Sequence, residues 1–477
     1  MLLLSLQSLF AALHFRPLPT SGPTTAEVVL GVLLIPSHLY FISCAVHADA
    51  IPGDRQYWLT RPFTRGQLLA AKLLLTLLIV HLPLFVSDCL ILIGHRFNPL
   101  LHLPALLWRQ ILYFLAVSIL MLALAAVTRN LSQLALAALV LAAAAIFVPA
   151  LLPWFNWPWG GLAWIKIIAN SLLACSGAAA VLYLLYLRRR VHAGWAVLAT
   201  TALVFPFATE LAPFAFAFRL QRQIHPSPNF HPIVKFVPER VRPAAGRSVN
   251  PKQLTLLLPI SVENLPTNSG AHADRIQATL RLPNGESHSL QLRGSWSADR
   301  GAAGDWLFFP IDPALFAKLA DRTVTIDVTL YMTTFGPHRS YVMPAKSPEP
   351  RPMAELGRCL SAPDLIGLVA VTCMAPVQLP SRITVQLVHP SGAQASREVR
   401  LNDGFNYSPF PADRFQLSPI ASATGHFNVM NVPGRHPSTN IQAQILASNL
   451  HFHLRDPQSH FTASLKVPPT LLRDLVY

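Results

Sequence analysis

Long runs without charged residues recur along the first 218 residues of the chain. A helix of about 20 apolar residues is long enough to cross the hydrocarbon core of a bilayer. Six segments meet that condition, two of them with one acidic residue inside (Asp88 and Glu210): residues 28–48, 73–93, 110–128, 134–152, 167–187 and 191–218. The pattern therefore predicts a membrane α-helical bundle over residues 1–218.

The first 15 residues are also apolar, but they are short for a crossing. They lack the basic start and the small-residue cleavage site of a signal peptide. They also fit the end of a first crossing helix whose start lies upstream, and we favour that interpretation. The bundle is therefore expected to contain six or seven transmembrane helices.

The pattern changes after residue 252, where apolar and polar residues alternate. A run over residues 323–330 has Val, Ile or Leu at every second position, which is typical of a half-buried strand. A similar run over residues 276–282 precedes Asn284-Gly285, a pair that predicts a tight hairpin. The C-terminal half is therefore expected to be all-β.

Two stretches of this half resemble each other, residues 275–285 and 382–392, at an offset of 107 residues. About 100 residues form one immunoglobulin-like sandwich, so we expect two immunoglobulin-like β-sandwiches. A chance similarity between two strand–turn–strand units remains open. The expected division is a transmembrane domain over 1–218, a basic Pro-rich linker over 219–252, and sandwiches over 253–346 and 353–477.

Composition and charge support a membrane protein. Of 477 residues, 52% are hydrophobic and 12% are charged, about half the charged fraction of a soluble domain. This excludes an ordinary soluble enzyme, a disordered chain and a small disulfide scaffold. The net charge of +15 suggests nucleic acid or an anionic membrane surface. Because part of it lies in short loops and in the linker, we expect membrane lipids and no nucleic acid as partners.

Basic residues in short loops predict the orientation, since cytoplasmic loops are enriched in Lys and Arg. The loops on one side of the predicted bundle carry eight, including Arg188-Arg189-Arg190. Those on the other side carry four, one of which is Arg109. We therefore expect the Arg188 side in the cytoplasm and the β region outside the cytoplasmic (inner) membrane.

The segment between the first two predicted helices contains Gly-Asp-Arg, Trp-Leu-Thr-Arg-Pro and Leu-Leu-Ala-Ala-Lys. It resembles the first cytoplasmic loop of the permease (membrane) subunits of type-2 ABC transporters, in a bacterial subgroup with a C-terminal extracytoplasmic domain. In that family the loop forms a short coupling helix that binds a separate ATPase subunit. The resemblance implies an ATPase contact formed by Asp54, Arg55, Trp58, Arg61, Pro62, Arg65 and Lys72.

The residues of this loop themselves leave two interpretations open. Trp and Arg commonly anchor interfaces, which favours the docking of a partner. A loop whose basic residues follow the positive-inside rule and whose aromatic rings rest on the bilayer would have the same composition. Pro62 disfavours helix in the residue before it, and Thr64 is expected to cap a helix that continues into the next span.

The sequence contains no phosphate-binding loop of the form G-x-x-x-x-G-K-[ST]. ATP hydrolysis would therefore need a separate ABC ATPase subunit, and we do not expect this chain to be an enzyme. The favoured function is the permease subunit of an ABC-type exporter of unknown substrate, which by resemblance forms a dimer of permease subunits. The alternative is a non-transporting, membrane-anchored protein whose extracytoplasmic β-domains bind a partner or ligand.

Polar residues inside predicted spans are functional candidates, because they are costly in hydrocarbon. His81 and Asp88 share the second span, and Glu210 lies in the last one. Two roles remain open for them. They line a substrate or proton pathway, or they pair with neighbours and reach water near the ends of the spans.

Three of the five cysteines fall in predicted spans, whereas Cys359 and Cys373 form a pair in the β half. We favour a disulfide between these two, which would close a loop worth about 3 kcal/mol in an oxidising compartment. Two cysteines are too few for a structural zinc site, and histidines such as His451 and His453 have no identifiable third ligand. We therefore expect no metal and no cofactor in this chain.

Overall fold

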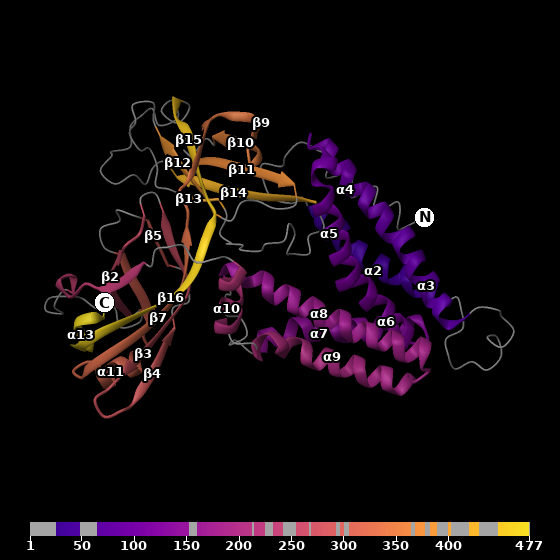
Figure 1. The fold of residues 1–477 in the computed structure, drawn as a ribbon, viewed down its shortest axis with the longest axis horizontal. Helices are drawn as coiled ribbons and strands as arrows, with labels where there is room; N and C mark the ends of the chain where they lie inside the picture. The colour runs from indigo at the N-terminus through magenta and orange to yellow at the C-terminus, as the bar shows by residue number, and fades with distance from the viewer. Residues whose placement is uncertain are drawn as a thin grey trace.

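The computed structural model of the chain describes residues 25–47, 64–151, 160–211, 214–224, 232–241, 254–266, 269–291, 296–299, 305–363, 368–376, 382–388, 399–401, 419–428 and 447–476. Within these residues, a helical region is followed by several antiparallel β-sheets in the C-terminal half (Figure 1). The N-terminal segment 1–15, expected to end a first crossing helix, lies outside the described residues.

The helices follow the apolar runs closely. α2 spans Thr25–His47, and α3 (Arg65–Thr76) continues through the π-helical η1 (Leu77–His81) into α4 (Leu82–Gly94). The next helix is built from η2 (Pro99–His102), α5 (Leu103–Tyr113), the π-helical η3 (Phe114–Ser118) and α6 (Ile119–Val127). Then come α7 (Leu131–Leu151), η5 (Gly160–Leu162), α8 (Ala163–Leu182), the π-helical η6 (Tyr183–Leu187), α9 (Val191–Leu211) and α10 (Phe214–Ile224).

Three of these continuous helices are long and apolar enough to cross a membrane: Gly66–Gly94, Pro99–Val127 and Ala163–Leu187. α2, α7 and α9 cover 23, 21 and 21 residues and coincide with three further apolar runs of the sequence. The run expected to cross as one helix to Phe218 is divided, because α9 ends at Leu211 and α10 begins at Phe214.

Small side chains allow α6, α8 and α9 to approach closely. Ala123 and Ala126 of α6 are buried in one cluster with Ala178 of α8. A Cβ atom added at Gly177 in α8 would overlap the side chain of Thr201 in α9. Helices in a bilayer gain no hydrophobic free energy from meeting one another, so their association depends on close packing of this kind.

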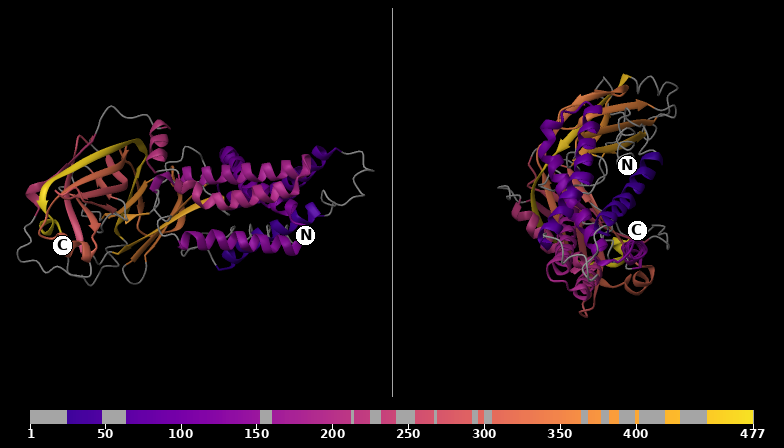
Figure 2. Two further views of the ribbon diagram at one scale, coloured as in Figure 1. Left: turned by 90° about the horizontal axis from the view of Figure 1, so that it is seen from below. Right: turned by 90° about the vertical axis from the view of Figure 1, so that its right-hand side faces the viewer.

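The β region lies at one end of the helices, which extend away from it side by side (Figures 1 and 2). The segment before α8 meets the β region directly, since the backbone N–H of Gly161 donates to Oδ1 of Asp274 at 3.4 Å. The continuous helix Ala163–Leu187 is about 35 Å long at 1.5 Å per residue. Arg188 and its basic neighbours therefore lie at the end of the bundle away from the β region.

The first pair of sheets encloses one buried core. Its smaller sheet contains β1 (Ile233–Phe236), β2 (Thr255–Glu263) and β6 (Asp305–Pro310), in the order β1-β2-β6. Its larger sheet has the order β16-β7-β3-β4, with β3 (Gly270–Arg281), β4 (Ser287–Gln291), β7 (Thr323–Phe335) and β16 (Pro457–Leu471), and β5 (Trp296–Asp299) also pairs with β3. Leu258 and Phe309 from one sheet meet Ile276 and Val328 from the other in the same core.

The second pair of sheets has its own core, which includes Val371, Val385 and Phe452. One sheet has the order β13-β12-β15-β8, built from β13 (Val399–Arg400), β12 (Arg382–Val388), β15 (Asn449–Arg455) and β8 (Arg339–Pro344). The other has the order β14-β11-β10-β9, built from β14 (Ile420–Asn428), β11 (Leu368–Pro376), β10 (Gly357–Pro363) and β9 (Ser347–Met353).

The sheets do not divide the chain where the sequence pattern suggested. β16 comes from the segment 353–477 yet pairs with β7 in the first sheet pair, whereas β8 comes from 253–346 and pairs with β15 in the second. The expected linker 219–252 contains the end of α10 and the whole of β1. Alternation identifies a strand but not its partner, because pairing is decided by long-range packing and register.

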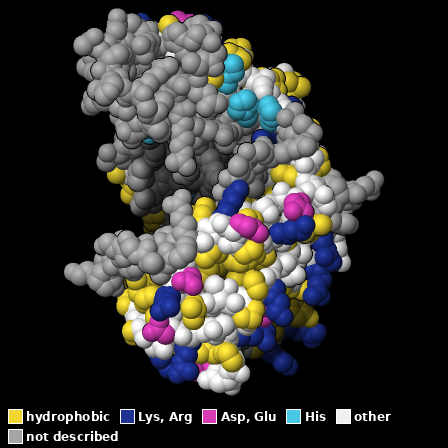
Figure 3. Space-filling model, turned by 90° about the vertical axis from the view of Figure 1, so that its left-hand side faces the viewer, with side chains coloured by type: hydrophobic (Ala, Val, Ile, Leu, Met, Phe, Trp, Pro, Cys, Tyr) yellow, Lys and Arg dark blue, Asp and Glu magenta, His cyan; other side chains and the backbone are white. Residues whose placement is uncertain are grey.

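The hairpin prediction at Asn284-Gly285 is confirmed. β3 and β4 pair from Arg281 opposite Ser287 to Gln277 opposite Gln291. Gly285 in the turn has a φ of +88°, a conformation that glycine adopts without strain. The outward face of the β region mixes acidic and basic side chains, with the basic ones in excess and with grouped histidines (Figure 3). On the part of this face that the structure describes, basic charge is therefore spread out rather than gathered in a single patch.

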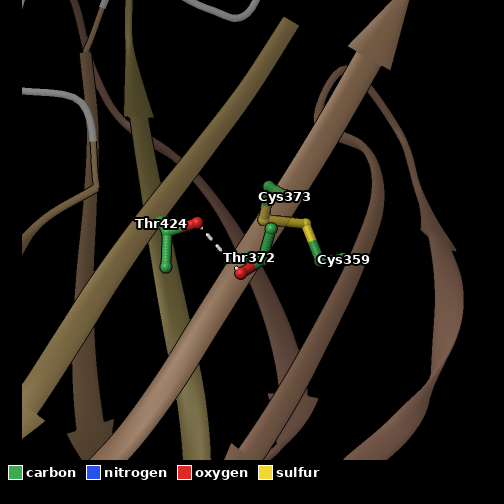
Figure 4. Close-up of a disulfide and its surroundings, with 4 residues drawn as sticks. All are labelled: Cys359, Thr372, Cys373 and Thr424. Atoms are coloured by element: carbon green, nitrogen blue, oxygen red, sulfur yellow. Dashed lines mark hydrogen bonds between the residues drawn. A yellow bond between two sulfur atoms is a disulfide. The ribbon is translucent and has the colours of Figure 1, made fainter. Parts of the chain in front are cut away.

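Cys359 and Cys373, the pair expected from the sequence, are joined by a disulfide (Figure 4). They lie directly opposite each other on β10 and β11, and both are fully buried in the second core. Beside them, the hydroxyls of Thr372 and Thr424 are 3.0 Å apart, which links β11 to β14. The bridge and the hydroxyl pair therefore connect three neighbouring strands.

We predict that replacing both cysteines by Ser lowers the free energy of unfolding of the second sheet pair by about 3 kcal/mol, because the unfolded chain is no longer cross-linked. Limited proteolysis of the full chain in detergent, over a denaturant series, measures this loss. The matched control is Cys175→Ser in α8, whose thiol is free. An unfolding midpoint that is insensitive to both the double substitution and reductant would contradict a bonded pair.

Candidate functional site

An ion pair lies inside the helical bundle. Asp88 on α4 and Arg109 on α5 are joined through Oδ2 and Nη1, and their side chains are only 4% and 14% exposed. The side-chain amide of Gln110 donates to the same carboxylate oxygen at 2.8 Å. A carboxylate and a guanidinium away from water need a partner of opposite charge and hydrogen bonds, and this arrangement supplies both.

The ion pair continues into a chain of hydrogen bonds that reaches the middle of the helices. Nδ1 of His81 lies 3.2 Å from Oε1 of Gln110, and Nε2 of His81 lies 2.9 Å from Oγ of Ser118. Gln110 therefore connects Asp88 to His81 by using its amide as both donor and acceptor. His81 is buried about midway along the continuous helix Gly66–Gly94.

Two π-helical segments meet at this chain. His81 is the last residue of η1, and Ser118 is the last residue of η3. A π-helical turn re-aims side chains within a helix and is common at functional sites. Here the His81–Ser118 hydrogen bond joins the two irregular segments across the contact between their helices.

A second histidine borders the network. The Tyr113 hydroxyl lies 3.4 Å from Nδ1 of His38 on α2, and that nitrogen is 2.6 Å from the Leu34 carbonyl. The ring of Tyr113 also packs edge-on against His81 with centroids 5.3 Å apart. Tyr113 thus extends the polar network from α4 and α5 to α2.

This arrangement can hold charge and orient polar groups inside the bundle. Its hydrogen bonds connect α5 to α2, to α4 and, through His81, to the π-helical η1. Among the residues that the structure describes, no group of three or more His, Cys, Asp and Glu side chains is placed to hold a metal ion.

The predicted ATPase-contact loop is only partly described. Asp54, Arg55, Trp58, Arg61 and Pro62 lie outside the described residues, and Arg65 is described only as the first residue of α3. The expectation that Thr64 caps the following helix is confirmed. Its hydroxyl accepts from the N–H of Gln67, whose side chain accepts in return from the Thr64 N–H at 2.7 Å.

Lys72 is buried between two helices. It is 4% exposed, and its Nζ donates to the carbonyls of Ala45 at 2.9 Å and Val46 at 2.8 Å. These are unpaired acceptors at the C-terminal end of α2, where a cation is favoured by the helix dipole. The side chain implied to face the ATPase instead ties α3 to α2.

His47 forms further contacts at the same end of the bundle. Its Nε2 lies 3.0 Å from the carbonyl of Ala125 and 3.1 Å from that of Thr128, at the end of α6. The last turn of α2 is therefore held by α3 on one side and by α6 on the other. Glu210, the third intramembrane candidate, is on α9, and its side chain lies outside the described residues.

A third polar cluster links the β region to the start of α8. Asp274 occupies a β-bulge, since Ala273 pairs with Met332 and Arg275 with Tyr331. At the bulge, Oδ1 of the buried carboxylate accepts from the N–H of Gly161, just before α8. Oδ2 accepts from the hydroxyl of Thr333 on the neighbouring strand β7 at 2.8 Å. An acidic group suits this position at the start of a helix.

Several of these residues were missed from the sequence. Arg109 was counted as a loop charge, although it lies within the helix Pro99–Val127 and pairs with Asp88. The available signal was one charge of each sign in neighbouring apolar runs. Gln110, Ser118 and Asp274 carry no comparable signal, because their roles depend on helix packing and on a bulge.

No protein-family model matches the chain, and no curated protein is similar to it. A solved structure described as a "tetra-tandem repeat in extending region of large adhesion protein" is similar at 11% identity and a TM-score of 0.12, covering 50% of this chain and 49% of that one. At this TM-score the similarity indicates neither a shared fold nor a shared function.

We predict that Asp88→Asn destabilises the protein by about 3 kcal/mol, because the Arg109 charge is left buried without its partner. The double variant Asp88→Asn with Arg109→Gln should lose less than the single one, since it removes both charges. Thermal unfolding of the full chain in detergent measures both effects.

The matched control is Asp327→Asn, which breaks the ion pair of that carboxylate with Arg281 on the surface. The side chains of Asp327 and Arg281 are 38% and 62% exposed. The loss of unfolding free energy should therefore be below about 1 kcal/mol. Equal losses from Asp88→Asn and Asp327→Asn would contradict a buried, structurally required pair.

Proposed function

We propose that the chain is the membrane permease subunit of an ABC-type exporter and that it works with a separate ATPase subunit. In this proposal the six apolar segments cross the membrane, the last of them through α9 only, a seventh crossing includes residues 1–15, and each pair of sheets is an immunoglobulin-like sandwich. The resemblance of residues 49–72 to the coupling loop of type-2 ABC permeases motivates it. The transported substrate is not specified by any feature of the chain.

The observation that carries the proposal is the anchoring of both ends of that loop. Lys72, in the second half of α3, ties that helix to carbonyls in the last turn of α2, and His47 ties the end of α2 to α6. The capping box at Thr64 defines where α3 begins. A loop held in this way transmits a push from a docked protein to three helices, which is what a coupling element requires.

The position of the loop supports the same function. η6 packs against α3, so the described residues that flank the loop share an end of the bundle with Arg188, Arg189 and Arg190. This end carries the larger number of basic loop residues and is therefore the cytoplasmic candidate. An ATPase is a cytoplasmic partner, so a docking loop at this end agrees with the proposal.

The β region fits the outside of the cell. A buried disulfide is stable in an oxidising compartment and is rare in the cytosol. Because the β region and the basic turn lie at opposite ends of the bundle, the disulfide and the basic residues support one orientation. The protein is accordingly proposed to reside in the inner membrane with its β region outside the cytoplasm.

In this proposal the polar network of Asp88, Gln110 and His81 lies where helices would move during export. Export requires helices to change their relative positions, and these three side chains lie at the contacts between helices that such a change would rearrange. The dimer of permease subunits is taken from the family resemblance alone. The alternative, a membrane-anchored protein whose β-domains bind an external partner, needs neither the anchored loop nor a nucleotide-binding partner.

We predict that Trp58→Ala with Arg61→Ala abolishes co-purification of an ABC ATPase with this chain from native membranes. The control is Arg129→Ala, an exposed basic residue between α6 and α7 that lies at the same end outside the loop. Mass spectrometry identifies the ATPase by its phosphate-binding loop. Retention of the ATPase by the double variant would show that the loop is not the contact, and absence of any ATPase from the unsubstituted protein would favour the alternative.

We also predict that a thiol placed at Asn284 reacts with a membrane-impermeant maleimide in intact cells, because this exposed turn residue would lie outside. Both this thiol and one at position 129 are introduced into a variant that lacks the free cysteines Cys44, Cys89 and Cys175. The thiol at position 129 should react only after permeabilisation. The reverse pattern would overturn the orientation.

A further inference from the structure

α10 is a short helix with three distinct faces. Successive residues are rotated by about 100° around a helix, which gathers Phe214, Ala217, Phe218 and Gln221 on one buried face. A second face carries Phe216, Leu220 and Ile224, which are 57%, 38% and 39% exposed. The third face carries the exposed residues Ala215, Arg219 and Arg222.

The buried face is fixed in place by both halves of the protein. Phe214 and Phe218 pack edge-on against Tyr331 of β7, with ring centroids 5.1 Å and 5.2 Å apart. Gln221 accepts a hydrogen bond from the indole N–H of Trp164, in the first turn of α8, at 2.9 Å. These contacts determine which side of α10 faces outwards, so the exposed apolar stripe is not a consequence of free rotation.

The location of α10 indicates what its apolar stripe meets. α10 follows α9 and crosses the end of α8 at a steep angle in two perpendicular views (Figures 1 and 2). A helix that crosses the end of a membrane-spanning helix runs along the bilayer surface. The buried Trp164 indole, which donates to Gln221, also fits the headgroup level, where Trp is enriched.

The order of the faces fits an interface between lipid and water. Around the helix the apolar stripe, the protein-facing side and the basic side follow one another, so each occupies about a third of the circumference. An interfacial helix places its apolar face among the acyl chains and its basic face at the headgroups. Long Arg side chains can also extend along a surface to reach phosphate groups.

We propose that α10 lies at the membrane–water boundary on the side of the β region, with Phe216, Leu220 and Ile224 inserted among lipid chains and Arg219 and Arg222 bound to the phosphates of anionic lipids. α10 would then hold the first sheet pair, through Tyr331, at a fixed height above the bilayer. This inference needs only that the helical half spans a membrane, and it stands whether or not an ATPase binds.

A spin-label experiment on the full chain in vesicles tests it. Nitroxides are placed singly at positions 216 and 220, and at position 215 as the control on the basic face. Collisions with oxygen report lipid contact, and collisions with a water-soluble nickel chelate report water contact. The ratio of oxygen to nickel collisions should be several-fold higher at 216 and 220 than at 215. Equal, water-like ratios at all three would overturn the proposal, as would labels at 216 and 220 that neither reagent reaches, which would indicate a second copy or another protein over the stripe.

The arginine part is tested by lipid composition. Vesicles of phosphatidylcholine alone are compared with vesicles that also contain phosphatidylglycerol. Anionic lipid should raise the ratio at position 216, and Arg219→Gln with Arg222→Gln should remove that increase while the label still meets lipid. No dependence on anionic lipid in the unsubstituted helix would contradict a phosphate contact.

Discussion

In the low dielectric of a bilayer a charged side chain is stable only when it is paired with an opposite charge. The helical half of this protein contains one such ion pair, Asp88–Arg109. Asp88 and Arg109 fix α4 against α5, and Gln110 uses both ends of its amide to extend that contact to His81. His81 then joins two π-helical turns through Ser118. With Tyr113 reaching His38, the same set of bonds determines how three helices meet.

Each end of the bundle is held by backbone groups that a helix terminus leaves unpaired. At one end Lys72 and His47 satisfy carbonyls of α2 and α6, and at the other the Asp274 carboxylate accepts from Gly161 just before α8. The continuous helix from Ala163 to Leu187 runs between these ends, and η6 packs against α3. Packed helices and these terminal hydrogen bonds therefore join the residues that flank the loop between α2 and α3 to the β region. The helical half and the β region are thus physically connected.

The local features were accessible from sequence, and the long-range ones were not. Apolar runs located the helices because crossing a bilayer demands length and hydrophobicity, and the Asn284-Gly285 turn and the Thr64 cap depend on neighbouring residues only. The partners of β8 and β16 depend on register between distant strands, and the carboxylate of Asp274 is aimed by a bulge that leaves no mark in the alternation. Lys72 appeared to belong to a surface loop, because a lysine that caps another helix is indistinguishable in sequence from one in solvent. Arg109 was assigned to a loop because its ion pair with Asp88 depends on how two helices pack.

We propose that the connection between α2 and α3 receives an ATPase, and site-specific photo-crosslinking in native membranes would capture that contact. A photoreactive amino acid is incorporated in place of Trp58, and its adducts are compared with those formed from position 129 at the same end of the bundle. Position 58 should yield an adduct with a protein that contains a G-x-x-x-x-G-K-[ST] phosphate-binding loop, whereas position 129 should not. Adducts from position 58 with lipid alone, or with proteins that bind no nucleotide, would contradict an ATPase contact.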